Sequence, residues 1–231
     1  MTALITLSHG SRHPGAQPEV SELTQAAARQ LGVTGVDAHL EFDTPDLTAA
    51  AHQLAEQGHI RAVVVPTLFT TAFHATHDVP EAIAAATAET GFDLVAADGL
   101  GQGRDVAAVL AARALIDAPR APRIVLYPVG TSNEEAAAKT VELGRDVEKL
   151  AGIPVTTVPA TGVGELVGAD GIDAVADENT HLLPLFVTRG LLLDRVHRMW
   201  PGSISAPLGA DLAHIIAARY WAAHSLSPAK V

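Results

Sequence analysis

Short apolar runs alternate with longer segments of helical periodicity along this chain. Residues 3–8 form an apolar run that ends in His-Gly, and residues 19–31 then carry apolar side chains at helical spacing up to Gly32. The predicted strands are 3–8, 36–42, 61–66, 92–96, 123–129, 155–158, 181–187 and 203–206. The predicted helices are 19–31, 46–57, 80–89, 105–116, 134–150, 191–199 and 212–223. This alternation predicts parallel sheets built through right-handed crossovers.

The pattern runs through the chain twice. Residues 117–122 contain two prolines and resemble a linker, after which the order of elements begins again. Four pairs of segments match in order: 7–11 with 127–131, 66–70 with 184–188, 100–101 with 208–209, and 105–113 with 211–219. We therefore expect an α/β fold of two similar lobes, 1–118 and 119–231, each a small parallel sheet flanked by helices, arising from an internal duplication.

Composition removes several classes of protein. The 231 residues are 48% hydrophobic, which argues against disorder, and the absence of Cys excludes disulfide scaffolds, thiolate nucleophiles and Cys metal sites. A net charge of −11 argues against nucleic-acid binding. No apolar run reaches the roughly 20 residues of a membrane helix, and residues 1–7 lack the features of a signal peptide. We expect a cytoplasmic protein that binds neither nucleic acid nor membrane.

Charge is distributed unevenly between the two parts. Residues 1–119 hold 14 acids and 5 bases, whereas residues 120–231 hold 12 acids and 10 bases. Seven of the 11 histidines also lie in the first part. This asymmetry indicates that the two parts have different roles.

Three polar residues of the first part follow predicted strands. His9 follows the first strand, Glu41 ends the second, and His74 lies on the loop after the third. Ligands of open parallel sheets bind beyond the carboxyl ends of strands, and two imidazoles with a carboxylate suit Fe²⁺, Co²⁺, Ni²⁺ or Zn²⁺. His9 aligns with Val129 in the second part, so the repeated fold does not require this histidine. We therefore predict a functional site at His9, Glu41 and His74.

Other polar positions have simpler interpretations. The histidines at 39, 52, 59, 181, 197, 214 and 224 are expected to be structural or exposed, while His13 and His77 stay open. The glycines near 99–103 and 162–168 miss the spacing of nucleotide-binding loops, so we interpret them as turns. The sequence Arg12-His13-Pro14 matches only part of the histidine-phosphatase motif, and a phosphatase-like hydrolase is a minor alternative.

Several motifs together resemble the class II tetrapyrrole chelatases of the small sirohydrochlorin cobaltochelatase and ferrochelatase type. They are Ser8-His-Gly-Ser-Arg12, Leu40-Glu-Phe42 with Thr44-Pro-Asp-Leu47, Val63-Val-Val-Pro-Thr-Leu68 with His74 and Asp78-Val-Pro80, and Leu100-Gly101. The resemblance covers residues 1–119 well and the remainder as a degenerate copy. His77 stands where the family usually has Lys or Arg, and Ala72-Phe73 replaces a more typical Gly-Gly.

The resemblance implies an enzyme, a lyase that inserts Co²⁺ or Fe²⁺ into sirohydrochlorin towards siroheme or cobalamin. His9, Glu41 and His74 would bind the metal and accept the pyrrole protons. Because the tetrapyrrole carries carboxylates, we expect Ser11, Arg12, His77 and Arg189 to bind it. The metal is a substrate, and no permanently bound cofactor is expected. A non-catalytic carrier of metal or tetrapyrrole is the alternative function, and both a monomer and a homodimer fit the sequence.

Overall fold

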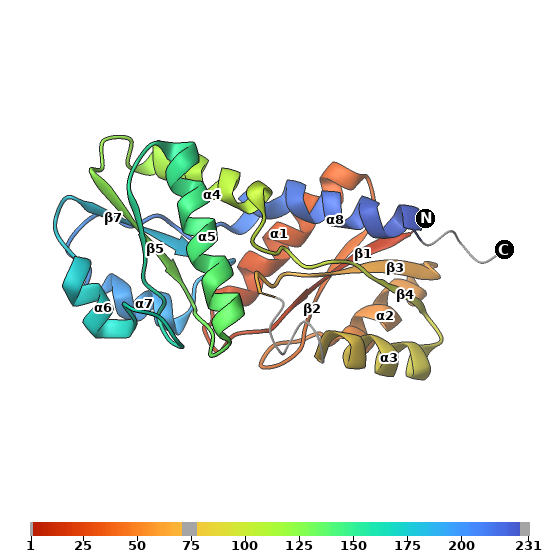
Figure 1. Ribbon diagram of the computed structural model, residues 1–231. Coiled ribbons are helices and arrows are strands. Elements are labelled where there is room, and N and C mark those ends of the chain that lie inside the picture. Colours follow the sequence, from red (N-terminus) through yellow and green to blue (C-terminus); the bar gives the residue numbers. More distant parts are fainter. Residues whose placement is uncertain (1, 71–77, 227–231) are drawn as a thin grey trace. The chain divides into compact units, whose positions relative to one another are not determined.

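The computed structural model describes residues 2–70 and 78–226 (Figure 1). The strands are β1 (Ala3–Ser8), β2 (Gly35–His39), β3 (Arg61–Pro66), β4 (Asp93–Ala96), β5 (Arg123–Pro128), β6 (Val155–Thr157) and β7 (Thr180–Leu185). The helices are α1 (Ala16–Leu31), α2 (Leu47–Glu56), α3 (Val79–Thr90), α4 (Arg104–Asp117), α5 (Glu134–Ala151), α6 (Gly168–Val175), α7 (Leu191–His197) and α8 (Ala213–Leu226), with a short 3₁₀ helix η2 (Gly209–Leu212). All strand pairs are parallel, as the alternating pattern predicts.

Internal contacts divide the chain into two compact units. Unit 1 comprises Met1–Gly101 and Gly209–Val231, and unit 2 comprises Gln102–Leu208. Each unit contains one parallel sheet, in the order β2-β1-β3-β4 in unit 1 and β6-β5-β7 in unit 2. The two orders agree over three strands, so each unit begins with the same βαβ arrangement. The predicted α/β class with two parallel sheets flanked by helices is confirmed.

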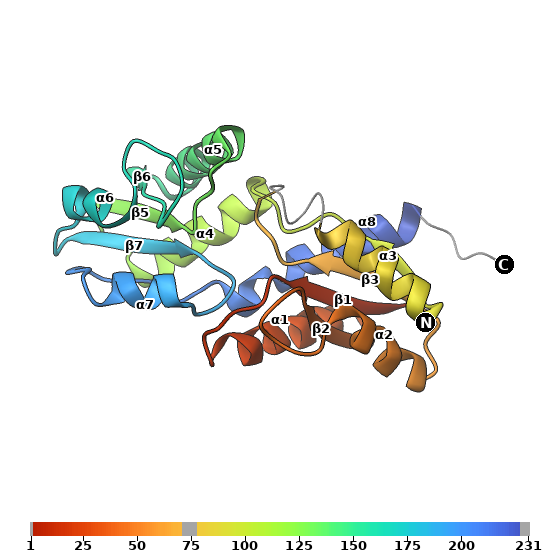
Figure 2. The same ribbon diagram turned by 90° about the horizontal axis from the view of Figure 1, so that it is seen from below.

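Unit 1 covers both faces of its sheet with helices. Helices α2 and α3 pack together on one face, and α1 and α8 pack together on the other (Figures 1 and 2). The α2–α3 face buries alternate residues of the central strands, such as Ile5 and Val64, against Leu54 of α2. The central strands β1 and β3 are buried along their whole length, as expected for a parallel sheet covered on both sides.

Unit 2 is built in the same way around three strands. Helices α6 and α7 cover one face, where Ile172 and Leu193 pack with Val125 and Phe186. Helix α5 lies against β6, and α4 contacts both α5 and β7. The predicted strand at 203–206 is reduced to a single parallel bridge between Leu182 and Ile204. Unit 2 therefore lacks a full counterpart of β4.

Two helices belong to a different unit from the one expected from their neighbours in sequence. The predicted division at 118 and 119 places residues 104–117 in the first lobe and residues 213–226 in the second. In the structure, α4 packs against α5 of unit 2, whereas α8 packs against α1 and β3 of unit 1. Both helices bury several apolar residues, and nearness in sequence does not decide which sheet a buried helix face packs against.

Smaller differences concern single elements. Helix α6 was not predicted, because residues 162–168 were interpreted as glycine turns and the helix begins at the last of them. Helix α1 starts at Ala16, three residues before the predicted start. Among the described residues, the structure contains no helix long and apolar enough to cross a membrane.

Candidate functional site

His9 and Glu41 lie side by side beyond the carboxyl ends of adjacent strands. Ser8 at the end of β1 pairs in register with His39 at the end of β2, and the pairing continues one step further because the Glu41 N–H donates to the His9 carbonyl oxygen at 2.9 Å. His9 is half-buried and Glu41 is exposed. The parallel register thus brings together two of the three predicted metal-binding residues.

Gly10 permits the close approach of these two strand ends. Its φ is +90°, and a Cβ atom at this position would lie 1.7 Å from the Glu41 carbonyl oxygen. Only glycine fits both the left-handed backbone and the contact. The Gly10 N–H also donates to Ser8 Oγ at 3.1 Å, which fixes the turn that carries His9.

Phe42 and Arg12 extend the site on the same side of unit 1. The Arg12 guanidinium carbon lies 4.6 Å from the Phe42 ring centroid, and the His9 and Phe42 rings meet edge to face at 5.9 Å between centroids. Ser11 is held in this loop because its N–H donates to Asp43 Oδ2 at 2.8 Å. Arg12 is exposed, so its guanidinium is accessible to an anionic ligand.

His13 has a role in local structure. Its Nδ1 accepts a hydrogen bond from the Gly15 N–H at 3.0 Å, and its carbonyl oxygen accepts one from the Ala16 N–H. These bonds organise the start of α1, where Gly15 supplies no side-chain cap. This arrangement accounts for His13 without a catalytic role.

A chain of hydrogen-bonded polar side chains is connected to the turn that carries His9, and it was not predicted. Ser8 Oγ lies 2.7 Å from His39 Nδ1, and His39 Nε2 lies 3.3 Å from Asp37 Oδ2. Ser21 Oγ of α1 then donates to Asp37 Oδ1 at 2.8 Å. Burial raises the pKa of Asp37, but hydrogen bonds from His39 and Ser21 outweigh it and hold that pKa below its ordinary value. The chain links the His9 turn to α1.

The remaining predicted site residues are His74, His77 and Arg189. His74 and His77 lie outside the described residues. Arg189 follows β7 in unit 2, where its carbonyl oxygen accepts a hydrogen bond from Thr188 Oγ1 at 3.2 Å. Within residues 2–70 and 78–226, no group of three or more His, Asp or Glu side chains could hold a metal ion. His9 and Glu41 are therefore the described part of the predicted set.

Unit 2 repeats the backbone conformation of the site but lacks the imidazole and carboxylate side chains. The Thr161 N–H donates to the Val129 carbonyl oxygen at 3.0 Å, the same bond that joins Glu41 to His9 in unit 1. Gly130 has a φ of +94°, and a Cβ there would lie 1.9 Å from the Thr161 carbonyl oxygen. Val129 and Thr161 thus occupy the positions of His9 and Glu41, as the sequence alignment of His9 with Val129 predicts.

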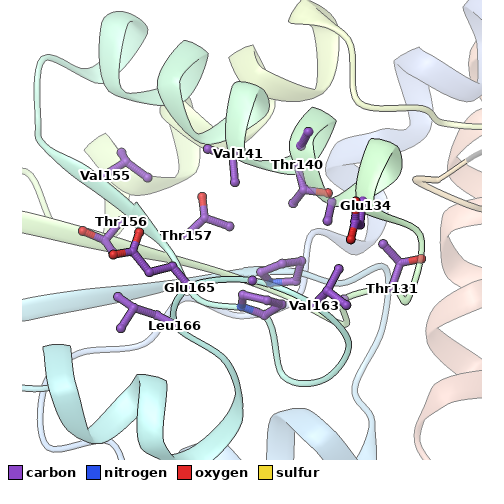
Figure 3. A pocket seen from close by; sticks show the side chains of 16 residues that line it. Thr131, Glu134, Thr140, Val141, Val155, Thr156, Thr157, Val163, Glu165 and Leu166 are labelled. Atoms are coloured by element: carbon purple, nitrogen blue, oxygen red, sulfur yellow. The ribbon is translucent and has the colours of Figure 1, made fainter.

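A cavity of about 540 Å³ lies in unit 2 between α5 and β6 (Figure 3). Val129 corresponds to His9 and Thr161 to Glu41, and the same correspondence can be extended along both units. Five of the residues that line the cavity then correspond to Gln17 and to the four residues of the polar chain in unit 1. They are Pro128, Ala137, Val141, Thr157 and Pro159 in place of Ser8, Gln17, Ser21, Asp37 and His39. Gln17 belongs to the network of unit 1 because its Nε2 donates to Asp37 Oδ2 at 3.3 Å. Small and apolar residues thus leave a cavity where unit 1 has a hydrogen-bonded network.

Sequence comparison places the first half of the chain among known proteins. Residues 3–116 match the CbiX family model. The sirohydrochlorin ferrochelatase of Bacillus subtilis (strain 168) is 33% identical over 82 residues, or 35% of this chain and 31% of that protein. The Priestia megaterium sirohydrochlorin ferrochelatase is 32% identical over 84 residues. The matched region thus spans about a third of the length of these curated relatives.

Comparison of structures extends the likeness to nearly the whole chain at the level of the fold. SirB from Bacillus subtilis with Fe³⁺ superposes with a TM-score of 0.81 and 21% identity, covering 98% of this chain and 97% of that one. The sirohydrochlorin chelatase SirB from Bacillus subtilis subspecies spizizenii, in complex with cobalt, gives 0.76 and 20%, with 97% and 96% covered. Residues 3–116 therefore belong to the CbiX family, and the likeness in fold to SirB extends over nearly the whole chain.

Proposed function

We propose that this protein inserts a divalent metal, Co²⁺ or Fe²⁺, into sirohydrochlorin. The observation that carries the proposal is the pair of His9 and Glu41 at adjacent strand ends, joined at 2.9 Å through their backbones and replaced by Val129 and Thr161 in unit 2. The family match over residues 3–116 and the names of the curated relatives support the choice of reaction and substrate.

The reaction requires groups that bind a cation and groups that accept protons. Insertion replaces two pyrrole N–H protons of the macrocycle by one M²⁺ ion, so two protons leave for each metal bound. An imidazole titrates near neutral pH and can ligate the metal or take a proton, and a carboxylate can do both as well. We assign these tasks to His9, Glu41 and His74, with the metal as substrate.

The carboxylates of the tetrapyrrole need cationic partners. We assign Arg12 to this role because its guanidinium is exposed and lies against the Phe42 ring, which also contacts the His9 imidazole. Ser11, His77 and Arg189 complete the proposed binding set. The cytoplasm as location, the siroheme or cobalamin pathway, and a monomer or homodimer are parts of the same proposal.

Turnover separates an enzyme from a carrier. The purified protein is mixed under anaerobic conditions with excess sirohydrochlorin and either Co²⁺ or Fe²⁺, and the absorption change of the macrocycle is followed. The proposal predicts many turnovers for each protein molecule with at least one metal, faster than the spontaneous reaction. A stoichiometric change that stops after one equivalent would indicate a carrier, and hydrolysis of a generic phosphate ester would favour the phosphatase alternative.

A further inference from the structure

Phe42 occupies a backbone conformation that is unfavourable for an aromatic residue. Its φ is +64°, and Phe42 is the one non-glycine residue with positive φ in the described part of the chain. The Asp43 N–H donates to the Glu41 carbonyl oxygen at 2.7 Å, so Phe42 is the middle residue of a γ-turn of the strained, positive-φ type. Such strain persists only where the surrounding structure or a function maintains it.

The equivalent position in unit 2 is a glycine. Because Thr161 corresponds to Glu41, the residue that corresponds to Phe42 is Gly162, and its φ is +88°. The repeated fold therefore places a left-handed residue here in both units, and glycine satisfies that requirement without strain. A phenylalanine at the position in unit 1 must be explained by its side chain.

The Phe42 side chain contributes little to the core. It is 51% exposed, and it is absent from the buried cluster between the sheet and helices α2 and α3. Its ring instead lies between two candidate site residues, in contact with the Arg12 guanidinium and edge to face with the His9 imidazole. An exposed, strained aromatic residue between a cation and an imidazole is suited to a flat, conjugated and anionic ligand.

We infer that Phe42 is the aromatic contact for the tetrapyrrole, an inference that rests on the proposed function. The ring packs against the planar macrocycle and removes apolar area of both groups from water. Arg12, held over the same ring, then meets a peripheral carboxylate, while His9 meets the metal centre. Phe42 is thereby a specificity-determining residue that matches the site to a planar conjugated substrate.

The test uses variants that remove the ring without straining the fold. Phe42→Gly and Phe42→Asn both tolerate a φ of +64°, whereas Phe42→Tyr keeps an aromatic ring. The dissociation constant of metal-free sirohydrochlorin is measured by fluorescence titration of the full-length protein, and Co²⁺ binding is measured separately by calorimetry. We expect the Gly and Asn variants to weaken tetrapyrrole binding by about tenfold, and the Tyr variant to stay within about twofold of the wild type.

The expected pattern also has a stability component. Thermal unfolding of Phe42→Gly should occur at or above the wild-type temperature, and Co²⁺ affinity should be unchanged, because His9 and Glu41 are retained. Equal tetrapyrrole affinity in the wild type and the Gly and Asn variants would overturn the inference, and so would a wild type that binds no sirohydrochlorin. Ring-dependent binding without metal insertion would instead overturn the proposed function and leave Phe42 as the contact of a carrier.

Discussion

Gly10 sets the distance between the two strand ends that hold His9 and Glu41. The residue has no Cβ to collide with the Glu41 carbonyl oxygen, and its φ of +90° suits glycine alone. The backbone conformation therefore requires glycine at position 10, and the same backbone holds His9 next to Glu41. Gly130 does the same in unit 2 beside Thr161, where that chemistry is lacking.

Substitution of Gly10 should therefore destabilise the protein severely. A methyl group 1.7 Å from a carbonyl oxygen forces the two loops apart, so we expect Gly10→Ala to reduce the free energy of unfolding by about 2–4 kcal/mol. The measurement is urea-induced unfolding followed by circular dichroism. Gly32→Ala is the matched control, because its φ is +67° with no atom within 4 Å, and it should cost about 1 kcal/mol. Equal losses for the two variants would contradict this account.

Position along a strand was sufficient to predict that some residues of the first part lie close together. His9 and Glu41 follow strands that pair in parallel, so their proximity could be predicted from the strand-end rule. The hydrogen-bonded chain from Ser8 through His39 to Asp37 could not be predicted in this way. His39 and Asp37 lie two residues apart in β2, but Ser8 and Ser21, which bond to them, lie on β1 and α1. The signal available was two polar residues inside an otherwise buried strand.

At the scale of elements, periodicity and capping residues predicted most helices and strands. Asp46 was expected to begin the second helix, and in the structure it is the N-cap of α2, with its side chain accepting a hydrogen bond from the Ala49 N–H at 2.8 Å. The strand at 203–206 was overpredicted, because Leu182 and Ile204 form only one bridge. Pattern predicts extended backbone there but does not determine how long the pairing continues.

The contribution of the Asp46 N-cap to helix α2 can be tested directly. We expect Asp46→Ala to lower the free energy of unfolding by about 1 kcal/mol, since it leaves an N–H of the first turn without its side-chain partner. Asp46→Asn retains an acceptor oxygen and should stay within about 0.5 kcal/mol of the wild type. Chemical denaturation of the three proteins provides the comparison. An alanine variant as stable as the asparagine variant would show that the cap contributes nothing.

His181 joins three elements of unit 2 through buried hydrogen bonds. Its Nδ1 lies 2.8 Å from Ser203 Oγ and its Nε2 lies 2.9 Å from Ser205 Oγ, which in turn donates to Asp117 Oδ2 at the end of α4. Burial lowers the pKa of His181 below its ordinary value of 6.5, against the opposing effects of the Asp117 charge and the Ser203 backbone. Folding therefore favours the neutral form of this histidine.

This lowered pKa predicts a pH-dependent stability with a definite sign. The unfolded chain binds a proton at His181 near pH 6.5, whereas the folded chain binds it only at lower pH. The contribution is complete above about pH 7 and is lost as the pH falls below 6.5, by up to about 1.4 kcal/mol for each pH unit. Unfolding free energies of the wild type and His181→Asn, measured from pH 5 to 8, should converge toward acid pH. A constant difference would refute the prediction.

At the scale of the whole molecule, the sequence predicted two similar α/β parts but not which helices belong to each. Segments 105–113 and 211–219 resemble one another, yet the first lies in α4 of unit 2 and the second lies largely in α8 of unit 1. Arg219 of α8 donates to the carbonyl oxygens of Gly99 and Leu100 at 3.0 and 2.9 Å, contacts that secure the helix in unit 1. Hydrophobic periodicity identifies a buried face but not its partner.

The charge asymmetry persists when it is counted by structural units. Unit 1 holds 13 acids and 5 bases, and unit 2 holds 13 acids and 10 bases. The more acidic unit is the one that contains His9 and Glu41, and its negative field attracts divalent cations. This difference agrees with the proposed function, in which the more acidic unit 1 attracts the metal cation and the less acidic unit 2 repels the anionic macrocycle less.

The proposed metal-insertion role of His9 is tested by the initial rate of metal insertion into sirohydrochlorin, measured for the wild type, His9→Ala and Val129→Ala. The last two variants truncate side chains at corresponding backbone positions of the two units. Only His9→Ala removes a group that can bind a metal or accept a proton. We expect a loss of at least about 100-fold for His9→Ala and a rate within about twofold of the wild type for Val129→Ala, with both variants folded. Equal rates for His9→Ala and the wild type would show that His9 has no part in metal insertion.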